Sequence, residues 1–190
     1  MKELLKEIKK CNICAAHLPL EPRPVLRFNK NSKILIIGQA PGTKAHESQT
    51  DFDDASGKKL RQWLGIDAKT FYNTNNIAVV PMGFCYPGKG RTGDLPPRPE
   101  CMPKWHQKIV DQLADLQLVI LIGQYAQKAY LKGNSYKNLT ETVRNYQEFL
   151  PAFFPIPHPS PTNRFWMAKN KWFEIEVIPI LQERVQVILQ

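Results

Sequence analysis

The sequence predicts an α/β fold: a three-layer αβα sandwich around a central four-stranded parallel sheet. Two observations carry this prediction. Four short apolar segments are typical of buried strands, and helical patterns lie between them. Strands that alternate with helices indicate a parallel sheet with helices on both faces. A chain of 190 residues is large enough to bury a substantial core and fits one compact domain, so we expect a single domain over residues 1–190.

The four expected strands differ in strength. Lys33–Gly38 (KILIIG) and Leu118–Gly123 (LVILIG) are β-branched and end on glycine, and Ile77–Met82 (IAVVPM) follows the polar turn NTNN. Near-continuous apolar runs of this kind suit a sheet that is covered on both faces. The fourth segment, Ala152–Pro157 (AFFPIP), gives a weaker strand signal because of its prolines.

The expected helices connect these strands. Leu60 and Leu64 stand at helical spacing, which predicts a helix over Gly57–Gly65. The other helical patterns cover Lys104–Leu116, Gln124–Leu131, Glu141–Leu150 and Asn170–Leu189. A bend is expected in the last of these at Pro179, because proline removes a backbone donor from a helix.

The charge and the composition of the chain indicate which kind of partner it binds and in which cellular compartment it is expected. The net charge is +9 and the pI is near 9.4, a balance that favours polyanion partners such as nucleic acid but that can also serve solubility alone. No apolar run approaches the roughly 18 residues of a membrane span. The first residues, MKELLKEIKKC, are charged and amphipathic, without the apolar core of a signal peptide. We therefore expect a cytoplasmic protein without a membrane partner.

The cysteines form a candidate metal site. Cys11 and Cys14 make a CxxC pair, and Cys85 and Cys101 lie far from it in the sequence. Disulfides are rare in a reducing cytosol. Four thiolates can hold either zinc or an iron–sulfur cluster, and the spacing alone does not choose between them or exclude coincidence. A metal site here would connect the N-terminal segment to the loop around Cys101.

Two unusual motifs follow expected strands, where ligands bind in open α/β sheets. The first strand runs into Gly38-Gln39-Ala40-Pro41-Gly42, a pattern that shapes a tight turn and exposes backbone N–H groups to a ligand. The last strand ends in His158-Pro159-Ser160-Pro161. A histidine there could donate a hydrogen bond to an anion that develops on a substrate, although such glycines and a single histidine can also be structural.

Phe52 is a further candidate because it lies in the polar stretch TDFDDASG before a helix. Aromatic rings in polar loops stack on nucleic-acid bases. The alternative is a hydrophobic staple for the helix that follows. The long loop Tyr86–Pro103, rich in proline and glycine, is also expected to be functional, since long loops in compact domains usually are.

Taken in order, these motifs resemble the uracil-DNA glycosylases of family four, the iron–sulfur branch of the uracil-DNA glycosylase superfamily. That family has an early CxxC, a GEAPG-like turn, a phenylalanine before a helix, a proline- and glycine-rich loop between two cysteines, and a histidine motif. The matching residues here are Cys11 and Cys14, Gly38–Gly42, Phe52 with Gly57 and Leu60, Cys85 with Tyr86–Glu100 and Cys101, LVILIGQYA, and HPSP. The resemblance covers the chain from Cys11 to about Lys171.

The resemblance implies a monomeric monofunctional DNA glycosylase with a 4Fe-4S cluster on Cys11, Cys14, Cys85 and Cys101. A flipped base would stack on Phe52, and the backbone amides of Gln39 and Ala40 would bind a pyrimidine carbonyl. His158 would stabilise the charge on the departing base while a water attacks the sugar carbon. Ser160, Asn163 and Arg164, which follow the histidine in sequence, would hold phosphates or fill the space that the flipped base leaves in the stack.

Two departures from the family pattern concern activity. The family's first motif carries a glutamate where this chain has Gln39, and a neutral amide is a poor general base. His46 and Glu47, a few residues further on, are the candidates to replace it. The asparagine that reads the uracil edge at the end of the second strand has no counterpart, because Pro81 stands at that place. The identity of the excised base therefore stays open.

Three interpretations remain. The first is a base-excision enzyme that removes uracil or another deaminated base from DNA. The second is a catalytically weak or inactive superfamily member that binds single-stranded or damaged nucleic acid, which Gln39 and Pro81 favour. The third is an unrelated α/β domain with a four-cysteine zinc module.

Overall fold

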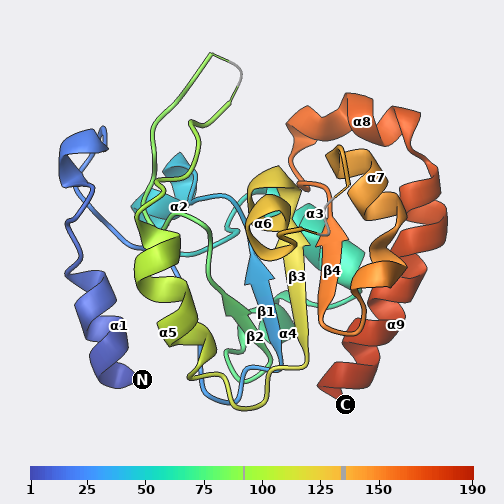
Figure 1. Ribbon diagram of the computed structural model, residues 1–190, viewed down its shortest axis with the longest axis horizontal. Coiled ribbons are helices and arrows are strands. Elements are labelled where there is room, and N and C mark those ends of the chain that lie inside the picture. Colours follow the sequence, from blue (N-terminus) through green and yellow to red (C-terminus); the bar gives the residue numbers. More distant parts are fainter. Residues whose placement is uncertain (92, 134–135) are drawn as a thin grey trace.

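The computed structural model describes residues 1–91, 93–133 and 136–190. Its sheet contains β1 (Ile34–Ile37), β2 (Ile77–Val79), β3 (Leu118–Ile122) and β4 (Phe153–Ile156). All neighbouring strands are parallel, in the order β2-β1-β3-β4 (Figure 1). The predicted four-stranded parallel sheet and α/β class are confirmed.

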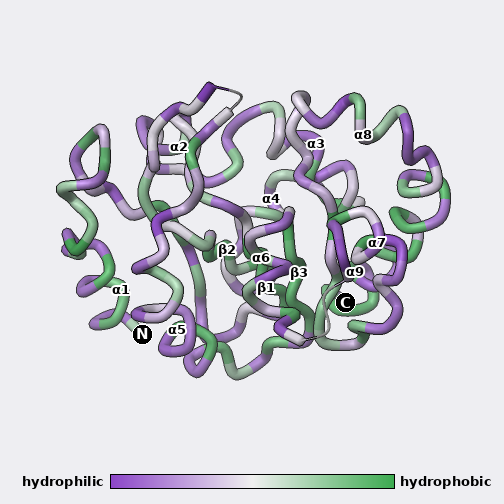
Figure 2. Tube along the Cα trace, turned by 45° about the horizontal axis from the view of Figure 1, so that its top comes forward, coloured by the Kyte–Doolittle hydropathy of each residue, from purple (hydrophilic) through white to green (hydrophobic). Residues whose placement is uncertain are grey.

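Each strand contributes side chains to two cores, one on each face of the sheet. Ile34 and Ile36 of β1 pack with side chains from the helices on one face, whereas Leu35 and Ile37 pack with those on the other. This alternation is the two-residue period of a β-strand. The strands are accordingly hydrophobic along their length and lie between two helical layers (Figure 2). The predicted three-layer arrangement is confirmed.

The first layer contains α3 (Ala55–Leu64), α4 (Ala68–Tyr72), α7 (Leu139–Arg144) and α9 (Ile178–Leu189). The helix α3 begins where Asp54 accepts a hydrogen bond from the backbone N–H of Gly57, 2.9 Å away. It ends at Gly65, whose φ of 66° is a left-handed conformation that glycine adopts without steric cost. These two local signals fix the start and the end of the helix.

The second layer contains α1 (Lys2–Lys9), α5 (Gln107–Val110) and α6 (Gly123–Tyr130). A π-helical segment, η2 (Met102–His106), precedes α5, and the expected helix over Lys104–Leu116 ends early, at Val110. After the helix, the N–H groups of Ala114 and Gln117 donate to the carbonyls of Lys30 and Lys33.

The last expected helix is also interrupted. A π-helical segment, η5 (Phe173–Val177), changes to α9 at Ile178, directly before Pro179. This change from π-helix to α-helix lies where the bend at Pro179 was expected, because proline has no N–H to donate to a hydrogen bond within the helix. The predicted helix over Glu141–Leu150 is divided into α7 and the short 3₁₀ helix η3 (Tyr146–Phe149).

Several short elements surround the carboxyl ends of the strands or the N-terminal segment. They are α2 (Thr43–Ser48), α8 (Arg164–Lys169), and the 3₁₀ turns η1 (Ala15–His17) and η4 (Pro161–Asn163). Within the described residues no helix is both long enough and apolar enough to span a bilayer.

Candidate active site

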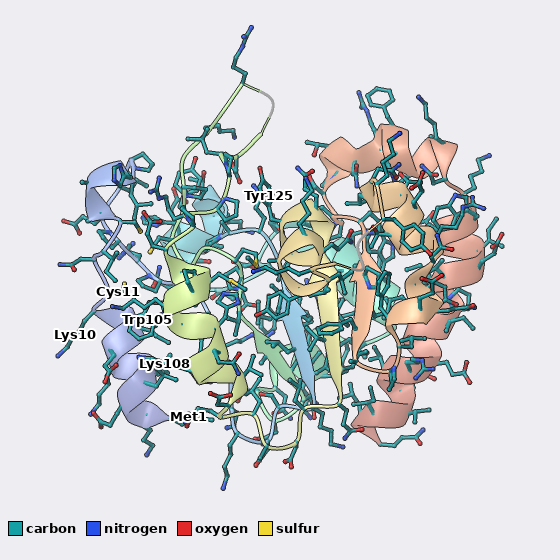
Figure 3. All side chains as sticks on the ribbon, viewed as in Figure 1. Met1, Lys10, Cys11, Trp105, Lys108 and Tyr125 are labelled. Atoms are coloured by element: carbon teal, nitrogen blue, oxygen red, sulfur yellow. The ribbon has the colours of Figure 1, made fainter. Side chains whose placement is uncertain are left out.

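A cavity of about 1020 Å³ opens at the carboxyl ends of the strands. Its walls come from the turn after β1, the segment before α3, the loop after β2, the start of α6 and the segment after β4. In Figure 1 these segments lie at the arrowheads of the strands, and Figure 3 places the labelled Tyr125 of α6 there. The fold therefore gathers the predicted strand-end motifs around one space.

The turn after β1 is Gly38–Gly42, and all five of its residues line the cavity. Its first two carbonyls are paired with the chain that extends beyond β2: the N–H of Met82 donates to Gly38 over 2.9 Å, and that of Gly83 donates to Gln39 over 3.0 Å. These bonds hold the turn on the sheet and fix its position in the wall of the cavity.

Phe52 lines the same cavity with a strained backbone. Its φ of 49° lies in the left-handed region that a bulky residue seldom adopts. Its carbonyl oxygen accepts hydrogen bonds from the Tyr72 hydroxyl at 3.3 Å and from Nη1 of Arg61 at 3.4 Å. A Cβ on Gly57 would overlap that oxygen. The conformation of Phe52 therefore requires a glycine at position 57.

The Phe52 ring packs edge-on against Phe71, with ring centroids 6.1 Å apart. Its Cζ lies 3.6 Å from where a Cβ on Gly38 would be. The ring is therefore supported by α4 on one side and by the turn after β1 on the other, which presents it as part of the cavity wall.

His158 follows β4 and lines the cavity. The backbone N–H of Ser160 donates to its Nδ1 over 3.2 Å. In the neutral ring the proton is then on Nε2, which makes Nε2 a hydrogen-bond donor. Burial lowers the pKa of His158, and the nearby carboxylates of Asp54 and Asp94 oppose that shift in part. The ring is therefore held as a neutral donor at the site.

The residues after His158 occupy different positions. Ser160 and Asn163 line the cavity, and Nδ2 of Asn163 donates to the His158 carbonyl over 3.0 Å. Arg164 begins α8 and is exposed, with its guanidinium 4.9 Å from the centre of the Phe165 ring. It is not among the residues that line the cavity, although it directly follows the lining residue Asn163.

Glu47 is not brought to the site. It is exposed on α2 and is not among the residues that line the cavity, because that helix turns its side chain outward. Its neighbour His46 is buried and packs near Tyr86, with ring centroids 6.2 Å apart. The prediction that either residue replaces the missing glutamate therefore has no support in this geometry, and Glu47 is corrected to a surface residue.

Comparison with known proteins assigns the family. The family model of the uracil DNA glycosylase superfamily matches residues 26–182, which is most of the chain. The chain belongs to this superfamily. Among solved structures it is similar to the solution NMR structure of a proposed uracil DNA glycosylase from Methanosarcina acetivorans, at 16% identity and a TM-score of 0.46, over 83% of this chain and 93% of that one.

The superfamily match contains the cavity motifs but begins after Cys11 and Cys14. The superfamily is thus shown, while the iron–sulfur subdivision stays a prediction. Within this superfamily domain, both departures noted in the sequence lie in the cavity wall, because Gln39 and Pro81 line it.

Gln39 and Pro81 each have a partner that sequence reasoning missed. Nε2 of Gln39 donates to the carbonyl of Leu95 in the long loop, 3.1 Å away. The carbonyl of Pro81 accepts from Nε2 of His106 at 3.1 Å, and Nδ1 of His106 lies 2.6 Å from the Tyr130 hydroxyl. Proline at this place therefore contributes a fixed carbonyl instead of a side-chain amide.

The four cysteines of this superfamily member come from the N-terminal segment, Cys11 and Cys14, and from the two ends of the long loop, Cys85 and Cys101. Cys14, Cys85 and Cys101 are buried, and Cys11 is partly buried, packing into the same apolar cluster as Trp105 (Figure 3). Burial raises the pKa of Cys85 to about 12 and that of Cys101 to about 11, and in both cases the neighbouring thiols raise it further. The N–H of Phe84 donates to Sγ of Cys101 over 3.5 Å.

Over the part of the chain that the structure describes, no three or more histidine, cysteine, aspartate or glutamate side chains are arranged to hold a metal ion. The identity of the ligand set therefore remains a prediction.

Proposed function

We propose that this superfamily member is a monofunctional DNA glycosylase that hydrolyses the N-glycosidic bond of uracil or another deaminated base. The observation that carries the proposal is His158, held in one cavity with Phe52 and with its Nδ1 occupied by Ser160. An Nε2 donor fixed in this way can stabilise negative charge on a departing base without reorganising first.

The other residues have distinct roles in the proposed reaction. The base, flipped out of the stack, enters the cavity and stacks on the Phe52 ring. The backbone amides of Gln39 and Ala40 bind a carbonyl of the base, and Gly42 keeps the end of the turn free of side-chain bulk. Ser160, Asn163 and Arg164 contact the DNA backbone, and the net charge of +9 attracts it.

We also propose that the four cysteines hold a 4Fe-4S cluster. What supports the proposal is the chemistry of the donor set, because four cysteines are the ligands that such a cluster uses and a bound cluster would hold them as thiolates. The hydrogen bond to Sγ of Cys101 is of the kind that surrounds cluster sulfurs. When bound, the cluster connects the N-terminal segment to the long loop and takes no part in excision. Zinc is the alternative occupant.

The alternative function is a catalytically weak or inactive member that binds single-stranded or damaged nucleic acid. The observation that favours it is the neutral Gln39, whose side-chain amide is engaged with Leu95. In either case we propose a monomeric cytoplasmic protein whose partner is DNA.

The test is base excision by metal-loaded protein. Oligonucleotides that carry deoxyuracil, hypoxanthine or xanthine are incubated in single- and double-stranded form, and abasic sites are detected by alkaline cleavage. Cleavage that increases with enzyme concentration supports the glycosylase and identifies its base. Folded, metal-loaded protein that binds these strands without cleaving any of them supports the alternative. Iron, sulfide and zinc analysis of the same preparation identifies the metal.

A further inference from the structure

The long loop between Cys85 and Cys101 places a carboxylate at the turn after β1. Oδ2 of Asp94 lies 3.5 Å from where a Cβ on Gly42 would be. Asp94 lines the cavity with His158; burial lowers the pKa of that histidine, and the charge of Asp94 opposes this shift in part. A non-local part of the chain thus brings an acid to the turn that lacks one of its own.

Backbone hydrogen bonds define the position of this carboxylate. Lys89 and Asp94 form an antiparallel bridge, and the N–H of Leu95 donates to the Gly88 carbonyl over 2.8 Å. Gly88 has a φ of 104°, a conformation available to glycine, and packs near Pro19. The base of the loop is therefore a small hairpin.

Gln39 attaches this hairpin to the turn. Its Nε2 donates to the Leu95 carbonyl over 3.1 Å, one residue after Asp94. A glutamate at position 39 could not make this bond, because an ionised carboxylate only accepts, and it would also repel Asp94. The neutral amide is therefore suited to hold a second residue that carries the charge.

We propose that Asp94 is the carboxylate that activates the attacking water, and that Gln39 is the residue that positions it. This inference rests on the proposed glycosylase function. In the step, the water oxygen bonds to C1′ of the sugar while the bond from C1′ to the base nitrogen breaks and its electron pair leaves with the base. One water proton passes to Asp94, and the other stays on the new hydroxyl. Asp94 then returns its proton to solvent or to the departed base.

Three other acids line the cavity, and each already has a partner in the fold. Oδ2 of Asp51 accepts a hydrogen bond from Nε of Arg27 over 2.8 Å. Asp54 uses Oδ1 to cap α3. Asp53 lies 3.8 Å from the Lys44 ammonium, so its carboxylate already has a cationic partner. Asp94 is exposed at the rim of the cavity, where water reaches it.

The experiment compares single-turnover excision by wild type, Asp94→Asn, Asp94→Ala and Asp115→Asn. Asp115 serves as the control because it is an exposed acid that does not line the cavity. Asp94→Asn is expected to lower the rate at least about 100-fold, the usual contribution of a general base, while binding of the uncleaved strand stays near that of wild type. Added formate is expected to restore part of the rate of Asp94→Ala, which loss of a merely structural residue would not allow. Asp115→Asn is expected to match wild type.

Gln39 is tested in the same assay. Gln39→Ala is expected to lower the rate in the wild-type background and to change it little in Asp94→Asn, because both substitutions remove the same carboxylate from its place. A rate for Asp94→Asn within about threefold of wild type overturns the inference and leaves the glycosylase proposal intact. A large loss in Asp54→Asn but not in Asp94→Asn also overturns it. A wild type that cleaves no substrate overturns both.

Discussion

Ser160 and His158 are joined by a hydrogen bond of 3.2 Å, in which the backbone N–H donates to Nδ1 of the ring. The two residues are separated by Pro159, which limits the conformations of the connection. The backbone itself thus sets which nitrogen of the ring carries the proton in the neutral form. Nε2 is left as the donor for a substrate, and this relationship leads to the first prediction.

Replacing His158 is expected to lower the rate of base excision without unfolding the protein. His158→Ala removes the Nε2 donor, and loss of one such donor in a preorganised site typically costs about 100- to 1,000-fold in turnover. Single-turnover excision and thermal unfolding of the same preparation measure the two effects. His17→Ala, at an exposed histidine of η1, is the matched control. Equal rates for His158→Ala and wild type would refute the assignment.

Gly57 is expected to tolerate no side chain. Its Cβ would overlap the Phe52 carbonyl oxygen, a backbone atom that has little room to shift. Gly57→Ala should therefore lower the free energy of unfolding by about 3 kcal/mol and weaken binding of substrate strands, because the strained Phe52 backbone must rearrange. Urea denaturation measures the stability. Gly38→Ala places its Cβ at an ordinary contact distance of 3.6 Å from Phe52, so a much smaller loss is expected there. Similar losses in both variants would contradict this reason.

The sequence was sufficient for the parts of the fold that depend on local pattern. The apolar runs predicted all four strands, and Leu60 and Leu64 predicted α3, because burial on both faces and helical spacing are visible within a few residues. The shorter helices α2, α4 and α8 were not predicted, since five or six residues do not establish a period.

The same distinction applies to the candidate site. The turn after β1, Phe52 and His158 could be found because each follows or precedes a predicted element. The bond from Gln39 to Leu95 joins residues 56 positions apart, and His106 reaches Pro81 across 25 positions. No local pattern indicates such contacts, so the sequence alone does not predict the positions of Asp94 and His106. Glu47 is close to Gln39 in sequence, but it lies on α2 with its side chain exposed, so closeness in sequence does not bring it to the cavity.

Replacing Cys85 is expected to lower both metal content and stability. Cys85 is buried, and a serine there has no sulfur with which to supply a thiolate to a shared cluster. Cys85→Ser should lose most of its bound iron and the visible absorbance of a cluster, and should unfold at a lower temperature. Met82→Leu, a volume-conserving change at another buried residue of the same segment, is the control. A fully loaded and equally stable Cys85→Ser protein would contradict the ligand set.

His106 links the stability of the fold to pH. Burial lowers its pKa from the ordinary 6.5 to about 4, and the bond to the Pro81 carbonyl opposes the shift in part. The unfolded chain therefore binds a proton between pH 6.5 and 4 that the folded protein does not. By linkage, the contribution of this neutral histidine is fully present above pH 6.5 and is lost as the pH falls towards 4.

Replacing His106 with glutamine tests this contribution. At pH 7, His106→Gln should be less stable than wild type by about 1–3 kcal/mol, because the Pro81 carbonyl or the Tyr130 hydroxyl loses its partner. From pH 6.5 to 4, the wild type should lose about 3 kcal/mol more than the variant, since glutamine does not titrate. Urea denaturation at pH 4.5, 5.5 and 7 gives both curves, and effects of other titrating groups cancel in their difference. Parallel curves across this range would show that His106 is not held neutral in the folded protein.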